Sequence, residues 1–68
     1  MTTEVDRAIA RINQCLSENY LPEGGKFWMN AMNRNLGMRR PADLIASGRL
    51  SDVSAVLAEA ERLAGGAW

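Results

Sequence analysis

One helix gives way to another within Trp28-Met-Asn-Ala-Met-Asn-Arg-Asn-Leu-Gly-Met-Arg-Arg-Pro-Ala-Asp-Leu-Ile45. The first part is apolar and carries a tryptophan. The middle is rich in asparagine and glycine, residue types that favour turns. The last part begins with Arg39-Arg40 and runs into Pro41, which suits the first position of a helix. The stretch therefore predicts two helices joined by an ordered turn.

The turn and its flanks carry the residues that we expect to be structural. Gly37 is expected at a positive φ or under a close backbone approach, while Leu36 and Met38 are expected to anchor the loop to the core. Asp43 lies in the first turn of the next helix, where a negative charge is favourable. The residues expected to build the core or to shape the turn are Trp28, Asn33, Leu36, Gly37, Pro41, Asp43, Leu44 and Ile45.

The rest of the chain predicts an all-α fold, a small bundle of about four helices within a single domain, residues 1–68. The expected helices cover residues 3–18, 26–32, 41–47 and 52–64. The first starts with a capping box of Thr3 and Asp6, and its apolar residues recur on one helical face. Ser51 is expected to be the N-cap of the last helix.

The sequence allows two starts for the second helix. Gly24-Gly25 weakens a helix by about 1 kcal/mol per glycine relative to alanine, so the firm part is expected at residues 26–32. Alternatively, Pro22 is the first residue of a helix that runs through the glycines. The segment is densely apolar, with Phe27, Trp28, Ala31 and Met32, so we expect it to be the most buried element.

Composition excludes several function classes. The chain has 68 residues, no histidine and one cysteine, so an internal disulfide is impossible and the usual zinc clusters are not expected. No motif for a catalytic serine, a P-loop or a dinucleotide site is present. We expect no enzyme activity, no catalytic residue, no metal and no cofactor, and Cys15 is expected to be a small buried hydrophobe rather than a reactive thiol.

Charge and hydropathy indicate where the chain acts. Eight Lys or Arg balance eight Asp or Glu, whereas a dedicated nucleic-acid binder usually shows a basic excess. No apolar run approaches the ~20 residues of a membrane span, and the start of the chain does not resemble a signal peptide. The protein is therefore expected in the cytoplasm.

A core this small supplies roughly 3–5 kcal/mol of folding stability. A protein partner or self-association is expected to add to it.

Two features have both a structural and a functional interpretation. Arg39 or Arg40 either pairs with Asp43 or another acidic residue, or contacts an acidic or phosphate group on a partner. Trp68, which follows Gly65-Gly66, either folds back on the core or is presented to a partner, because tryptophan is a favoured interface anchor. The residues alone leave both alternatives open.

The order of residues from Trp28 to Gly48 resembles the toxin-binding domain of the Xre/MbcA/ParS antitoxin family. That family has a pattern close to W-L-x-x-x-N-x-x-L-G-G-R-x-P-x-D-L-L. The residues that fall in register are Trp28, Asn33, Leu36, Gly37, Arg39, Pro41, Asp43, Leu44 and Ile45. The last helix matches the family only loosely, and the likeness covers about two-thirds of the chain.

The chain departs from the pattern at three positions. Met38 replaces the second glycine, Met29 stands where leucine is usual, and Met32 stands where proline is common. Residues 1–27 are too short for the DNA-binding helix-turn-helix domain that many members carry, so the resemblance gives no support for autorepression of an operon.

The resemblance implies a small helical protein that binds a RES-domain toxin, which consumes NAD or uses it to modify a target protein. In the family, the C-terminal end reaches toward the toxin's active site and blocks it. By this analogy, the partner-binding residues expected here are Arg39, Arg40, Gly66, Ala67 and Trp68.

Two other functions remain compatible with the sequence. One alternative is a phage-encoded or free-standing protein that binds a host protein, such as a component of a host toxin-antitoxin system. A small dimeric DNA-binding regulator would instead use the arginine cluster Arg34, Arg39, Arg40 and Arg49, and its binding would depend strongly on salt.

Overall fold

Four α-helices and one 3-10 helix make up the fold in a computed structural model, which describes residues 3–63. The elements in chain order are α1 (Glu4–Asn19), α2 (Pro22–Asn30), η1 (Arg34–Leu36), α3 (Pro41–Ala46) and α4 (Leu50–Leu63). The expected all-α fold is confirmed. None of the helices in the described part of the chain is long and apolar enough to cross a membrane.

Helix α1 begins as the sequence predicts. The Thr3 backbone N–H donates to the Asp6 carboxylate at 3.3 Å, and the Asp6 backbone N–H donates to the Thr3 hydroxyl at 3.1 Å. This reciprocal pair satisfies two backbone donors that have no partner inside the helix. At the other end, the Asn19 side chain donates to the Cys15 carbonyl at 2.8 Å, and the helix ends at Asn19.

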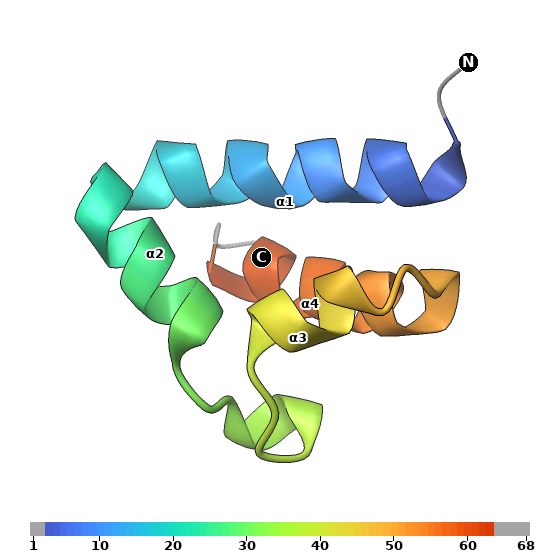
Figure 1. Ribbon diagram of the computed structural model, residues 1–68. Coiled ribbons are helices and arrows are strands. Elements are labelled where there is room, and N and C mark those ends of the chain that lie inside the picture. Colours follow the sequence, from blue (N-terminus) through green and yellow to red (C-terminus); the bar gives the residue numbers. More distant parts are fainter. Residues whose placement is uncertain (1–2, 64–68) are drawn as a thin grey trace.

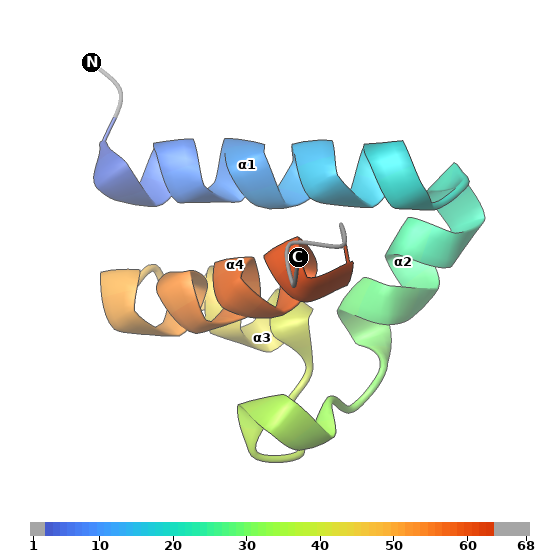
Figure 2. The ribbon, with the colours of Figure 1, turned by 180° about the vertical axis from the view of Figure 1, so that it is seen from behind.

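The core lies between α1 on one side and α3 and α4 on the other. Helices α1 and α4 share the most extensive packing, and they lie alongside each other in both views (Figures 1 and 2). Cys15 is buried, as the sequence predicts, with only 2% of its surface exposed. The apolar residues of the buried cluster are Ile12, Cys15, Leu16, Leu36, Leu44, Val53, Val56 and Ala60.

Helix α2 is longer and more exposed than expected. It runs from Pro22 through both glycines to Asn30, so the alternative start at Pro22 is the correct one. The prediction that this segment is the most buried is wrong, because α2 contributes no residue to the buried set of the described chain. Trp28 is half-buried and packs against the core, whereas Phe27 is 76% exposed.

Helix α2 is exposed because only one narrow face of it packs against the rest of the fold. Successive residues of an α-helix are about 100° apart, so Phe27 lies across the helix from Gly25 and Met29. On the packed face, glycine allows a close approach: a Cβ at Gly25 would lie 3.8 Å from the Cβ of Leu16. Apolar density alone therefore overestimated the burial of this helix.

The two glycines of α2 predict opposite responses to alanine. A Cβ at Gly25 makes an ordinary contact, so Gly25→Ala is expected to raise the free energy of unfolding by about 0.5–1 kcal/mol through helix propensity. A Cβ at Gly24 would lie 3.2 and 3.3 Å from atoms of the Tyr20 side chain. Gly24→Ala is therefore expected to gain nothing or to destabilise. Urea unfolding of both variants measures the difference, and equal gains would contradict this packing.

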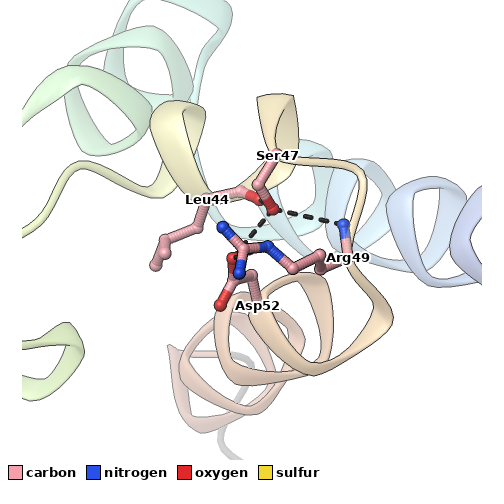
Figure 3. A network of polar contacts seen from close by, with 4 residues as sticks. All are labelled: Leu44, Ser47, Arg49 and Asp52. Atoms are coloured by element: carbon pink, nitrogen blue, oxygen red, sulfur yellow. Dashed lines mark hydrogen bonds and ion pairs between the residues drawn. The ribbon is translucent and has the colours of Figure 1, made fainter.

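The junction between α3 and α4 corrects a predicted cap. Helix α4 starts at Leu50, so Ser51 lies inside the helix and is not its N-cap. Instead, the Ser47 hydroxyl accepts from the Arg49 backbone N–H at 3.2 Å. It also lies 2.7 Å from the Leu44 carbonyl and 2.8 Å from the Asp52 carboxylate (Figure 3). A hydroxyl has one hydrogen, so it donates to one of these two acceptors at a time.

Other boundaries agree within a residue or two. Helix α3 starts at Pro41, as predicted, and ends at Ala46 rather than at residue 47. Gly48 follows it with a φ of 72°, which fits the expected helix stop. The expected end of the last helix at residue 64 lies outside the described residues.

Candidate functional site

The turn between α2 and α3, residues 31–40, is the best-defined surface feature among the residues named from the sequence. It projects from the bundle at the end farthest from α1, and both views agree on this placement (Figures 1 and 2). Its two arms meet at an antiparallel bridge between Asn33 and Arg39. The Asn33 backbone N–H donates to the Arg39 carbonyl at 3.1 Å, and the Met38 N–H donates to the Asn33 carbonyl at 2.9 Å.

Asn33 organises the inside of the turn. Its side-chain oxygen accepts from the Asn35 backbone N–H at 2.9 Å, and its backbone carbonyl also accepts from the Leu36 N–H at 3.0 Å. Asparagine suits this position because its short side chain bonds to backbone two residues on. The structural role predicted for Asn33 thus has a direct geometric basis.

Two contacts fasten the turn to the bundle. Leu36 is buried with 5% of its surface exposed, which confirms it as an anchor. The Asn35 side chain donates to the Glu59 carboxylate on α4 at 3.2 Å. The sequence predicts that Asn35 lies in the polar turn but not that it contacts α4, because its partner lies 24 residues away and no local pattern connects the two.

Met38 is not the second anchor that the sequence predicted. Its side chain is 58% exposed, and its backbone adopts a φ of 61°, next to Gly37 at 72°. The chain reverses direction at these two left-handed residues, and the Met38 side chain points into solvent. The only sequence signal for a positive φ at Met38 is the second glycine of the family pattern.

Met38 therefore holds a strained conformation. A left-handed non-glycine residue costs roughly 1–2 kcal/mol, while glycine costs about 0.5–1 kcal/mol through its greater freedom in the unfolded chain. Met38→Gly is expected to raise the free energy of unfolding by about 0.5–1 kcal/mol, as measured by urea denaturation. Met32→Gly is the matched control. Met32 is also 58% exposed but has no positive φ, so its replacement is expected to destabilise.

The two arginines of the turn have different surroundings. Arg39 donates from Nε to the Leu36 carbonyl at 3.0 Å in a partly buried position, so it holds the turn together. Arg40 lies 3.9 Å from the Asp43 carboxylate, with both side chains at least half exposed. This is a weak surface pair, and it leaves the Arg40 guanidinium accessible to a partner.

The larger arginine cluster predicted from the sequence is not a single site. Arg34, Arg39 and Arg40 belong to the turn, but Arg49 lies beyond α3, where its Nε is 3.6 Å from the Asp52 carboxylate. The expected contacts Gly66, Ala67 and Trp68 lie outside the described residues. Arg34, Arg39 and Arg40 thus share one turn, and Arg49 belongs to a different segment.

A second surface feature is an apolar hollow between α1 and α2, of about 400 Å³. Leu16, Leu21, Pro22 and Met29 line it, together with polar side chains at its rim. Leu21 is 76% exposed there. Among residues 3–63, no group of three or more His, Cys, Asp or Glu side chains could hold a metal ion.

No family model, curated protein or solved structure matches the chain.

Proposed function

We propose that this chain is an antitoxin-type binding protein that neutralises a RES-domain, NAD-consuming toxin by covering its active site. The observation that carries the proposal is the residue order from Trp28 to Ile45, which resembles the toxin-binding domain of the Xre/MbcA/ParS family. On this proposal the chain has no catalytic residue and acts by occupying a surface.

The backbone of the turn supports the proposal independently of residue identity. The family pattern has two successive glycines where this chain has Gly37 and Met38. Both residues adopt a positive φ here, 72° and 61°, a conformation that favours glycine. A turn of this shape explains why a pattern with two glycines fits the chain even though the second glycine is replaced.

The roles of the other motif residues are also consistent with a protein-binding domain. Leu36, Pro41 and Leu44 are buried, and Ile45 packs against the core. They build the scaffold, while Arg40 of the turn and the sequence Gly66-Ala67-Trp68 are proposed to contact the toxin. Since the toxin's substrate NAD is in the cytoplasm, the proposal also places the chain there.

Co-expression with a panel of RES-domain toxins tests this function. A toxin that arrests growth when expressed alone is expected to be tolerated in the presence of the chain and to co-purify with it. A catalytically inactive toxin expressed alone gives the reference growth rate. Failure to bind or to neutralise any toxin of the panel would contradict the proposal.

A further inference from the structure

Charge is unevenly distributed along this neutral chain. Residues 24–42 contain four cations, Lys26, Arg34, Arg39 and Arg40, and no acidic residue, so this segment carries a charge of +4. The rest of the chain holds the other four cations and all eight acidic residues, and therefore carries −4. The positive segment includes the whole projecting turn (Figure 1). Two carboxylates from outside the segment lie against it, Asp43 at 3.9 Å from Arg40 and Glu59 at 3.2 Å from the Asn35 side chain, so the three arginines of the turn outnumber the acidic side chains beside them.

The same turn exposes large apolar side chains. Met32 and Met38 are each 58% exposed. The bridge between Asn33 and Arg39 sets Met32 across from Arg40, because antiparallel pairing places the residues before and after a bridge opposite each other. Met38 directly precedes Arg39 in the chain. Exposed methionine and arginine are therefore interleaved over one short segment.

Met38 contributes little to the fold that would account for its identity. Its side chain is mostly in solvent, and its left-handed backbone would be better served by glycine. A strained residue of this kind points to a role outside folding. Methionine adapts to irregular apolar pockets and is over-used at binding surfaces, so the side chain suits insertion into a partner.

We propose that the turn surface, defined by Met32, Arg34, Met38 and Arg40, docks on a protein that presents an apolar pocket bordered by carboxylates. The methionines fill the pocket, and the arginines pair with the carboxylates. Arg39 is a positioning residue, because its Nε is bonded to the Leu36 carbonyl. The inference rests on the proposal that the chain acts by binding a protein, and it names the chemistry of that partner.

A protein fits this surface better than a nucleic acid does. Nucleic-acid affinity comes largely from neutralising several phosphates, and the chain as a whole has no net charge to attract them. Single-stranded nucleic acid would also call for aromatic stacking platforms. The exposed large apolar side chains of the turn are methionines instead.

The test uses a displayed library of random peptides selected on the immobilised chain. Enriched peptides are expected to combine Asp or Glu with Leu, Ile, Phe or Trp. Their affinity is expected to fall about tenfold or more for Met38→Gly and for Arg34→Glu, the loss typical of interface anchors. Met38→Gly is expected to stabilise the fold, so weaker binding by this variant is not a consequence of unfolding.

Matched controls lie outside the turn. Leu21→Ala removes an exposed apolar side chain from the α1–α2 hollow, and Arg7→Glu reverses an exposed charge on α1. Both are expected to bind the selected peptides within twofold of the unmodified chain. Binding that depends on Leu21 rather than Met38 would overturn the inference and would assign the interface to the hollow.

Four other results would overturn the inference. The selection could enrich no peptide, or it could enrich peptides without acidic residues. A double-stranded DNA oligonucleotide could bind the turn at low salt, or the chain could form a dimer that is lost in Arg34→Glu.

The peptide selection needs no toxin. A failure of toxin neutralisation with intact peptide selectivity would therefore refute the proposed function alone, and the reverse result would refute this inference alone.

Discussion

Replacing Leu44 by alanine is expected to leave the chain largely unfolded. Leu44 is 3% exposed and belongs to the buried cluster between α1, α3 and α4. Truncating a buried leucine costs about 2–5 kcal/mol, because apolar contacts are lost and a cavity remains. A core of this size supplies roughly 3–5 kcal/mol in total. Far-UV circular dichroism and urea unfolding are expected to show loss of helix and of the cooperative transition.

The same substitution at Leu21 is the control for this prediction. Leu21 is 76% exposed, so Leu21→Ala is expected to change the free energy of unfolding by less than about 0.5 kcal/mol, as for most surface positions. The two variants remove the same atoms, one from a buried position inside α3 and one from an exposed position at the start of α2. A Leu44→Ala protein that unfolds at the same urea concentration as the unmodified chain would show that α3 is not packed as described.

Trp68→Ala is expected to weaken toxin neutralisation by about 30-fold. On the proposed analogy with the antitoxin family, Trp68 would contact the toxin's active site, and a tryptophan anchor at an interface commonly contributes 2 kcal/mol or more. The residue lies outside the described part of the structure, so this expectation depends on the sequence. The measurement is the concentration of the chain that halves NAD consumption by a purified RES-domain toxin.

Phe27→Ala is the matched aromatic control. Phe27 is exposed on α2, and the proposed contacts do not include it. The Phe27→Ala variant is expected to inhibit the toxin at the same concentration as the unmodified chain. If Trp68→Ala also inhibits without loss, the tail mechanism is wrong, and the turn would have to supply the blocking contacts.

Local signals predicted much of the fold because their physical causes are local. The capping box of Thr3 and Asp6, the helix start at Pro41 and the positive φ at Gly37 each depend on a few neighbouring residues. The burial of Cys15 followed from its place beside the apolar stripe of its own helix. Such features need no knowledge of how the helices are arranged.

The predictions that failed required knowledge of that arrangement. The apolar density of Phe27-Trp28 could not show that α2 packs through one narrow face and leaves Phe27 in solvent. Ser51-Asp52 was a plausible cap, but Ser47 is the residue that fits the geometry between α3 and α4.

The candidate site was predicted in part. The sequence names Arg39 and Arg40 together, and both are exposed. Only the bond from Arg39 Nε to the Leu36 carbonyl distinguishes a positioning role for Arg39 from a contact role for Arg40. In the sequence, Met32 and Met38 are departures from a family pattern, and Met38 is predicted to anchor the loop to the core. Their exposure and the strain at Met38 are visible only in the structure.

Titration of a purified RES-domain toxin with this chain, followed by NAD consumption, tests the central claim most directly. The proposed function predicts that activity falls linearly with added chain and is abolished at a fixed molar ratio, because inhibition occurs by stoichiometric occlusion. If a large molar excess of the chain leaves NAD consumption by the RES-domain toxins undiminished, the proposed function is contradicted.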